Sequence, residues 1–442
     1  MGPPSAAPFG DREVGRRAAR LAMIPAMTTR EAVLAPEADP AEAGFDAERL
    51  RRIDRHFDRY VDDGRLPGYL AVVARDGAIV HVASGGRRDL EAGAPVEPDT
   101  IWRIYSMTKP VTTVAAMMLF EEGAFQLTDP VARFIPSFAD ARVYLRGSAA
   151  RPLTVPVAEP MRLWHLMTHT SGLTYGFHHT HAVDEIYRAN GYEWGTPPGL
   201  DLAACCDAWA ALPLAFQPGA EWLYSVATDV LGRVVEVVSG QSLDAFLADR
   251  VFGPLGMTDT AFFAAPEDHG RLAALYAPDP QTGLATRFDT MGKAALRPPD
   301  ALSGGGGLVS TAADYLRFSH MLLGGGEADG TRLLGPRTLD YMVRNHLPGG
   351  VDLAAFGRPL FAESIFEGVG FGLGFSVVED PVAGRTPSSE GEFGWGGAAS
   401  TAFWIDPAER LVVLFLTQLL PSSTHPIRPQ LHQLVRQAIV DR

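Results

Sequence analysis

The chain has 442 residues, of which 46% are hydrophobic and 20% charged, and its net charge at neutral pH is −14. This length allows a large core and two domains or lobes, while the acidic charge argues against nucleic acid and anionic membranes as partners. No apolar run approaches the length of a membrane span. The two cysteines, Cys205 and Cys206, are adjacent and fit no disulfide framework or zinc spacing, which indicates a reducing compartment or indifference to redox conditions. We expect a cytoplasmic protein.

The first predicted elements lie in the N-terminal part of the chain. Residues 1–40 are rich in Ala, Pro, Arg and Glu, lack the periodicity of a core element, and are predicted to form a disordered tail. Residues 47–61 carry apolar side chains at helical spacing, which predicts an amphipathic helix. Two apolar segments, 69–74 and 78–83, are joined through Asp76-Gly77, a pair typical of a tight hairpin turn.

A serine and a lysine precede the next predicted helix at a spacing that brings their side chains together. Only two of the 38 basic residues are lysines, and Lys109 follows Ser106 by three positions, which places both on one helix face. A lysine can lose its proton when buried, whereas an arginine cannot, so this pair is one way to build an activated serine. Apolar residues recur at helical spacing from Lys109 to Gly123, which we expect to end the helix. The alternative is that Ser106 only caps the helix and Lys109 is solvated.

Strand patterns occur near both ends of the chain, whereas residues 110–299 show mainly helical patterns and long Pro- and Gly-rich loops. This order predicts an α/β protein of the α+β type. Residues 41–109 and 300–442 are expected to form one sheet domain, and residues 110–299 an inserted, mainly helical lobe. The expected C-terminal elements are three strands and a closing helix, over residues 372–378, 399–405, 411–416 and 429–440.

Two further segments carry features of functional loops. Tyr224 lies just before a strong helical pattern for which Ser225 is a natural cap, although an aromatic side chain there could also serve only in packing. Residues 394–398 read Gly-Trp-Gly-Gly-Ala and are predicted to run into a strand that ends at Ile405. Glycines on a strand mark a close approach of a ligand or backbone, and a free N–H there could form half of an oxyanion hole. The alternative is a structural bulge beside a core tryptophan.

Motifs of several other chemistries are incomplete, so we expect no cofactor and no metal. Residues 303–307 are glycine-rich but lack the Lys-Ser/Thr ending of a phosphate-binding loop, which indicates only a close backbone approach. His165 and His169 have helical spacing, yet no Glu follows the first of them as a zinc-protease signature requires. Three histidines between residues 178 and 181 are better explained as a solvated loop than as a metal site. No Gly-x-Ser-x-Gly elbow occurs, which disfavours an α/β-hydrolase.

Taken in order, Ser106-x-x-Lys109, Tyr224-Ser225 and Trp395-Gly396-Gly397 resemble the motifs of the serine β-lactamase and penicillin-binding-protein superfamily. The chain looks closer still to the family VIII carboxylesterases, the esterase branch related to class C β-lactamases. The ordered combination is more specific than any single motif. The likeness spans roughly residues 45–420 and includes the connecting segments 127–131, 165–173, 217–219 and 254–257.

The resemblance implies a β-lactamase/transpeptidase-like fold, in which a mixed antiparallel sheet flanked by helices lies beside a helical lobe, with the active site in the cleft between them. It implies that Ser106 is the acylated nucleophile, and that Lys109 and Tyr224 share its proton as general base and acid. The N–H groups of Ser106 and Ala398 would form the oxyanion hole. The substrate would contact five further residues: Trp395, Gly396, Gly397, Tyr175 and Phe177.

Two departures from the β-lactamase pattern bear on the substrate. Position 226 is Val where the β-lactamase motif has Asn, so an amide donor is missing. Position 395 is Trp where the third motif has Lys, so the cation that receives the antibiotic carboxylate is missing. Both departures point to a serine carboxylesterase that hydrolyses small, uncharged carboxylic esters through an acyl-enzyme.

Other functions of the same superfamily share this chemistry. A weak β-lactamase, a D-amino-acid peptidase or amidase, and an acyltransferase that uses an alcohol acceptor all proceed through an acyl-enzyme. A non-enzymatic penicillin-recognising module is a further alternative, against which the intact Ser106, Lys109 and Tyr224 argue. The expected partner is a small-molecule ester, and the sequence leaves open whether the chain forms a homo-oligomer.

Overall fold

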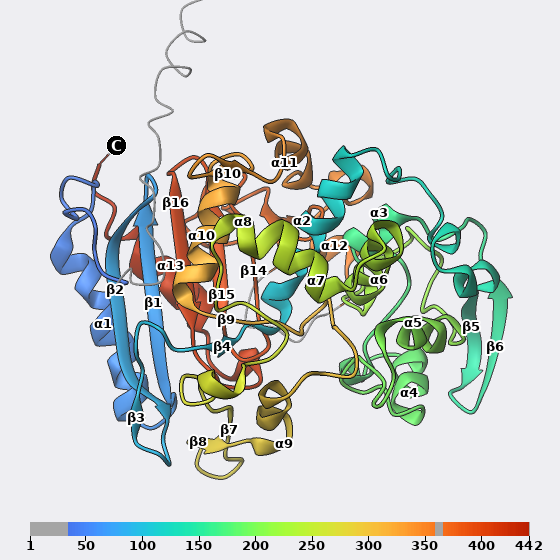
Figure 1. The fold of residues 1–442 in the computed structure, drawn as a ribbon, viewed down its shortest axis with the longest axis horizontal. Helices are drawn as coiled ribbons and strands as arrows, with labels where there is room; N and C mark the ends of the chain where they lie inside the picture. Colours follow the sequence, from blue (N-terminus) through green and yellow to red (C-terminus); the bar gives the residue numbers. More distant parts are fainter. Residues whose placement is uncertain (1–33, 359–365, 442) are drawn as a thin grey trace, which may run out of the picture.

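The computed structural model describes residues 34–358 and 366–441, and its centre is one eight-stranded sheet (Figure 1). Strands from the C-terminal part of the chain join strands from the N-terminal part where β16 pairs with β1. The prediction of one sheet built from both ends of the chain is therefore confirmed. Each neighbouring pair is antiparallel, so the sheet is antiparallel throughout rather than mixed. In spatial order the strands are β12 (Val369–Phe371), β13 (Ser376–Val378), β14 (Phe393–Gly396), β15 (Ala402–Asp406), β16 (Leu411–Leu416), β1 (Gly68–Arg75), β2 (Ala78–Asp89) and β3 (Ala94–Pro95).

Helices cover both faces of this sheet because its central strands are apolar on both sides. In β1, Leu70 and Val72 belong to one core, whereas Tyr69 and Val73 belong to the other, as the alternation of a pleated strand requires. The first core also holds side chains of α2 and α10, and the second those of α1 and α13 (Figure 1). These four helices span Thr108–Glu121, Ala312–Leu323, Ala47–Asp62 and Ile427–Arg436, respectively.

Helix α1 and the first hairpin confirm the predictions for the N-terminal part. The carboxylate of Asp46 accepts a hydrogen bond from Arg49 N at 3.0 Å and so caps α1. In the turn between β1 and β2, Asp76 and Gly77 have φ of 55° and 83°, the left-handed conformation that a two-residue hairpin of this kind needs.

The expectation of a disordered tail over residues 1–40 needs a correction. Residues 34–40 pack on the edge of the fold, because Leu34 is buried and the N–H of Glu37 donates to Ile79 O at 2.7 Å. Residues 1–33 lie outside the residues that the structure describes.

The segment between α2 and α10 is mainly helical and lies largely to one side of the sheet (Figure 1). It also contains a hairpin, β5 and β6, that the sequence did not predict, because its exposed strands carry arginines and no continuous apolar pattern. Further along, Ala274 and Tyr276 join the core beneath α1 and α13, so this part of the segment packs on the sheet. The elements are β5 (Arg142–Ser148), β6 (Arg151–Pro156), α3 (Leu163–Met167), α4 (Ala182–Ala189), α5 (Leu202–Ala210), α6 (Ala227–Ser239), α7 (Leu243–Leu247), α8 (Gly253–Leu255), β7 (Tyr276–Pro278), β8 (Ala285–Arg287) and α9 (Asp289–Gly292).

The smaller elements complete the fold. A short pair, β4 (Trp102–Arg103) with β9 (Val309–Ser310), connects the region before α2 to the region before α10. The remaining elements are β10 (Glu327–Ala328), β11 (Thr331–Arg332), α11 (Pro336–Met342) and α12 (Leu353–Phe356). Over residues 34–358 and 366–441, no helix has the length and apolarity needed to cross a membrane.

Three predictions for the C-terminal part are corrected. Residues 394–398 do not run into the strand that ends near Ile405, because β14 ends at Gly396 and a turn leads into the antiparallel β15. The strand expected over residues 372–378 begins only at Ser376, because residues 372–375 form the turn between β12 and β13, where Gly374 has φ of 87°. The closing helix is α13, Ile427–Arg436. It begins and ends a few residues earlier than the predicted helix over residues 429–440.

Candidate active site

Ser106 lies in a single turn of 3-10 helix, Tyr105–Met107, that leads directly into α2. Tyr105 has a φ of 44°, which is uncommon for a bulky residue and is held by its surroundings. The hydroxyl of Tyr315, on α10, donates to Met107 O at 2.9 Å and ties the turn to the core. Within the described residues α2 has no side-chain cap, so the alternative that Ser106 merely caps the helix is wrong.

Lys109 is buried, with 1% of its surface exposed, and its ammonium group lies at the centre of the candidate site. Its Nζ donates to Gly305 O at 2.6 Å and to the hydroxyl of Tyr175 at 3.1 Å, and it lies 3.4 Å from Ser106 Oγ. Lys293, by contrast, is largely exposed and pairs with Asp289. The alternative of a solvated Lys109 is therefore wrong, and the structure brings the predicted serine and lysine together.

Tyr224 joins this pair through its ring. Lys109 Nζ lies 4.4 Å from the centroid of the Tyr224 ring, a cation–π contact. The hydroxyl of Tyr224 accepts a hydrogen bond from Trp395 Nε1 at 3.3 Å. His178 Nε2 bonds Tyr224 O at 2.6 Å, so the peptide next to α6 is fixed as well.

Tyr175 lies deeper in the site than its predicted role as a substrate contact suggests. It is buried, its hydroxyl touches Lys109 Nζ, and its ring stacks on Phe177 with centroids 4.7 Å apart. Burial, together with the nearby Asp229 and Tyr224, raises the pKa of Tyr175 well above its usual value, so the hydroxyl stays neutral. Phe177 in turn stacks on Trp194, which is 63% exposed. An aromatic stack thus leads from Lys109 to the surface.

The third predicted motif lies at the end of β14 and contacts the turn that holds Ser106. A side chain on Gly397 would overlap Ile104 O, two residues before Ser106, so only glycine permits this approach. Trp395 faces Tyr224 on one side of the strand. Gly396 faces the other side, where the guanidinium of Arg428 lies against it. Ala398 is exposed on the turn that follows.

The site also includes buried polar residues to which the sequence assigned no role in it. The carboxylate of Asp229, on α6, is buried and accepts hydrogen bonds from Ser303 Oγ and from Gly305 N. His169 is fully buried against Ser225 Oγ, and burial holds its pKa well below the usual value, so it is neutral. No short motif marks these contacts, because the partners lie more than fifty residues apart in the chain.

The histidines near residue 178 are only in part the solvated loop that the sequence suggested, because His179 is exposed whereas the other two make contacts. His178 is partly buried against Tyr224, and His181 caps α4 by accepting from Val183 N. Over residues 34–358 and 366–441, no three His, Cys, Asp or Glu side chains are grouped so that they could hold a metal ion. Cys205 and Cys206 are both buried free thiols.

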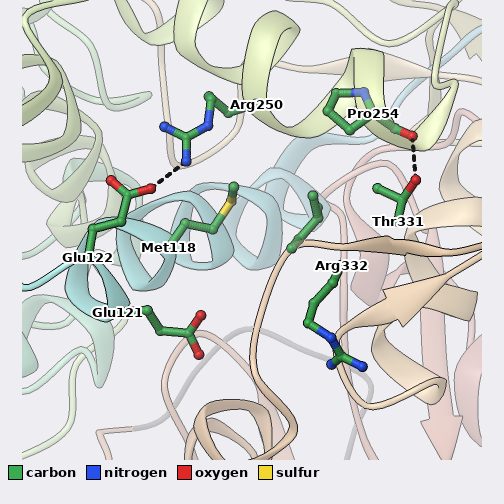
Figure 2. Close-up of a pocket in the computed structure, with 8 residues that line it drawn as sticks. Met118, Glu121, Glu122, Arg250, Pro254, Thr331 and Arg332 are labelled. Atoms are coloured by element: carbon green, nitrogen blue, oxygen red, sulfur yellow. Dashed lines mark hydrogen bonds and ion pairs between the residues drawn. The ribbon is translucent and has the colours of Figure 1, made fainter.

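A separate hollow of about 370 Å³ lies at the C-terminal end of α2 (Figure 2). Lys109 and the end of α2 are about 18 Å apart along the helix axis, at 1.5 Å per residue, so this hollow is not part of the candidate site. Its charged groups are already paired, since Arg250 contacts Glu122 at 2.5 Å and Glu121 accepts from Gly335 N. The residues that line it are Met118, Glu121, Glu122, Arg250, Pro254, Thr331, Arg332 and Leu333.

The fold and this cluster define a serine hydrolase with a β-lactamase/transpeptidase-like architecture. The Beta-lactamase family matches residues 53–437, and the chain therefore belongs to that family. Together with the relatives described next, this makes the protein an enzyme that acts on carboxylic esters.

Two sequence relatives and one solved structure are informative. Protein Rv1367c of Mycobacterium tuberculosis is 40% identical over 366 residues, which cover 81% of this chain and 88% of the relative. Esterase EstB of Burkholderia gladioli is 35% identical over 396 residues, covering 86% and 93% of the two chains. The structure of EstCE1, a hydrolase with promiscuous acyltransferase activity, matches with a TM-score of 0.74 and 28% identity, over 88% of this chain and 98% of that one.

Proposed function

We propose that the chain is a serine carboxylesterase that hydrolyses small, uncharged esters through an acyl-enzyme on Ser106. The observation that carries this proposal is the buried side-chain nitrogen of Lys109, which lies 3.4 Å from Ser106 Oγ. The groups around it come from both parts of the fold: Trp395 from the sheet, and Tyr175 and Tyr224 from the helical segment. We therefore place the site in the cleft between the sheet and the helical lobe.

Acylation begins when Lys109 Nζ, as the free amine, takes the hydroxyl proton of Ser106. The bond from Oγ to the ester carbonyl carbon forms, and the carbonyl π pair moves onto the oxygen. The N–H groups of Ser106 and Ala398 stabilise this oxyanion, and the approach of Gly397 to Ile104 supports that assignment because it brings the two segments together. When the intermediate collapses, the bond to the alcohol breaks, and the proton passes from Lys109 through the Tyr224 hydroxyl to the leaving alkoxide.

Deacylation uses the same groups in reverse order. Lys109 with Tyr224 takes a proton from water while the water oxygen bonds to the acyl carbon. The bond between this carbon and Ser106 Oγ then breaks, and the proton returns to the serine oxygen. Tyr175 keeps Lys109 in place during both steps through its neutral hydroxyl, 3.1 Å from Nζ.

We base the preference for uncharged substrates on the side chains that lie on the two faces of β14. A substrate in the cleft meets the indole of Trp395, which faces Tyr224. The Arg428 guanidinium could replace the missing lysine only if it reached the same side. It lies instead against Gly396, on the opposite face of the strand, and donates to Gly397 O and Thr401 O. Phe177 and Trp194 extend the apolar wall toward the surface.

We expect a fluorophosphonate to label the protein once, on Ser106. Mass spectrometry of the digested adduct should place the added mass on the peptide that contains Ser106, because this hydroxyl is partly exposed and lies 3.4 Å from Lys109 Nζ. Ser106→Ala should abolish labelling and hydrolysis while leaving the circular-dichroism spectrum unchanged. Labelling of Ser225 or Ser303 in the unmodified protein would refute the assignment.

A further prediction compares the catalytic efficiency of the enzyme on esters with that on β-lactams. Nitrophenyl acetate and butyrate should be turned over with a much higher kcat/KM than nitrocefin or a penicillin. A charge-assisted hydrogen bond to a buried carboxylate contributes about 1.5–3 kcal/mol, and Trp395 offers no positive charge to form one. Trp395→Lys should reduce the difference in kcat/KM between esters and β-lactams by improving β-lactam binding. Equal efficiency of the unmodified enzyme on both substrate classes would make it a β-lactamase instead.

Acyl transfer to an alcohol is the second candidate activity. The acyl-enzyme is the same, and only the nucleophile that resolves it differs. The similarity to EstCE1, whose name includes promiscuous acyltransferase activity, supports this candidate. Adding a primary alcohol to the nitrophenyl butyrate assay and measuring the new ester against free butyrate separates transfer from hydrolysis. The cytoplasmic location stays a prediction.

A further inference from the structure

The glycine-rich segment 303–307, which the sequence indicated only as a close backbone approach, meets a buried carboxylate next to Lys109. Asp229 lies in the first turn of α6 with 2% of its surface exposed. A carboxylate at such a depth is costly unless it is hydrogen-bonded or near a positive charge. It takes no part in the proton transfers described above, so its presence at this place needs an explanation.

The contacts of Asp229 lead to Lys109 in two steps. Its Oδ1 accepts hydrogen bonds from Ser303 Oγ and from Gly305 N, the second at 3.1 Å. The carbonyl oxygen of the same Gly305 accepts the shortest hydrogen bond of Lys109 Nζ, at 2.6 Å. The carboxylate therefore fixes the N–H side of Gly305, the residue whose carbonyl oxygen binds the lysine.

The glycines make this approach sterically feasible. A side chain on Gly305 would overlap Asp229 Oδ2 and come within 3.1 Å of the Tyr175 hydroxyl. A side chain on Gly304 would come within 2.9 Å of Thr228 O and 3.0 Å of Thr112. Only a loop without side chains can pass between α2, α6 and Tyr175 at this distance, which accounts for the Gly-Gly sequence in physical terms.

The charges of Asp229 and Lys109 also bear on the role of the carboxylate. Burial raises the pKa of the Asp229 carboxyl above its ordinary value, although the positive charge of Lys109 and the bonds from Ser303 and Gly305 act in the opposite direction. Opposite charges on Asp229 and Lys109 attract each other. Tyr175, Tyr224 and the neutral His169 are the other titratable groups around the lysine. Asp229 is the negatively charged group among them.

We propose that Asp229 is a positioning residue, which fixes Lys109 through the Ser303–Gly305 loop and offsets the positive charge that Lys109 gains when it takes the proton of Ser106. This inference rests on the proposed esterase mechanism. The proton that leaves Ser106 makes a buried ammonium ion, and a fixed carboxylate nearby stabilises that ion without rearrangement. Asp229 itself touches neither the ester nor the reacting atoms.

Asp229→Asn tests the proposal, because it keeps an oxygen acceptor and removes the charge. In the folded variant, kcat for nitrophenyl butyrate should fall at least about tenfold while KM stays within about twofold, as a loss of transition-state stabilisation predicts. The acidic limb of the kcat/KM profile should move to lower pH, because the ammonium form of Lys109 has lost its counter-charge. Phosphonate labelling of Ser106 should slow by a factor similar to that for kcat.

Asp314→Asn is the matched control. Asp314 is also a buried carboxylate that accepts from a backbone N–H and a hydroxyl, those of Asp259 and Thr260, but it lies on α10 and has no contact with Lys109. This variant should lose thermal stability without a change in the pH profile. The inference would be wrong if Asp229→Asn matched the unmodified enzyme in kcat and in its pH profile. It would also be wrong if, in both variants, the loss of activity only followed the decrease in melting temperature.

Ser303→Ala serves if Asp229→Asn does not fold, since it removes one hydrogen bond of the carboxylate and leaves the charge in place. It should lower kcat less than the charge removal, by about three- to tenfold, again with KM nearly unchanged. An unaltered kcat in Ser303→Ala would count against the positioning role. Absence of ester hydrolysis by the unmodified protein would refute the proposed function instead, so the two failures are distinguishable.

Discussion

Lys109→Arg should abolish most of the activity although the positive charge is kept. The proposed role requires a neutral amine for part of the cycle, and a guanidinium does not give up its proton in a protein. The site also has no room for the larger group, because Nζ sits between Ser106 Oγ, the Tyr175 hydroxyl and Gly305 O in a buried pocket. We expect kcat to fall roughly 10²–10⁴-fold, nearly as far as in Lys109→Ala.

The chain offers a matched control for this substitution. Lys293 is the other lysine, its side chain is 67% exposed, and its Nζ pairs with Asp289 at 2.8 Å. Lys293→Arg should therefore leave both kcat and KM unchanged. Circular dichroism and thermal melting must show that Lys109→Arg is folded, since overpacking of a buried site is itself destabilising. A folded Lys109→Arg enzyme with near-normal kcat would mean that Lys109 acts only as a fixed charge, and that a tyrosine is the sole base.

Local patterns in the sequence were sufficient for the elements and residues whose interactions are local. Asp76-Gly77 specifies its hairpin turn because both residues tolerate positive φ. Ser106 and Lys109 meet because they are three positions apart at the start of a helix. Lys109 was also distinguishable because lysines are so rare in this chain. The sheet from both ends of the chain followed from the order of strand and helix patterns.

Contacts between distant segments could not be predicted in the same way. The strand β14 was not recognised as a separate strand, because two of its residues are glycines and carry no apolar pattern. Two contacts form only when α2, α6 and two loops pack together. These are the hydrogen bond between Lys109 and Tyr175 and the hydrogen bond between Gly305 and Asp229. The sequence indicated that residues 303–307 approach a backbone closely, but not what they approach. Tertiary packing supplies that information, and a single sequence does not display it.

The hydroxyl groups of the two tyrosines have different partners: that of Tyr175 contacts Lys109 Nζ, and that of Tyr224 contacts Trp395 Nε1. Tyr224→Phe removes the hydroxyl that Trp395 Nε1 contacts and keeps the ring over Lys109. Tyr175→Phe removes the hydroxyl that Lys109 Nζ contacts and keeps the stack on Phe177. The two variants therefore separate proton transfer to the leaving group from the placement of the lysine.

Tyr224→Phe should lower kcat roughly 10²–10⁴-fold with a small change in KM, as for loss of a well-placed general acid. The loss should be largest for esters of poorly acidic alcohols and smaller for nitrophenyl esters, whose leaving group needs little protonation. Tyr175→Phe should lower kcat by a similar factor for both kinds of ester, because it disturbs Lys109 rather than the leaving group. Steady-state kinetics on ethyl butyrate and nitrophenyl butyrate measures this difference. Full activity of Tyr224→Phe on ethyl butyrate, together with a leaving-group dependence in Tyr175→Phe, would transfer the acid role to Tyr175 and leave Tyr224 as the aromatic surface on which the lysine rests.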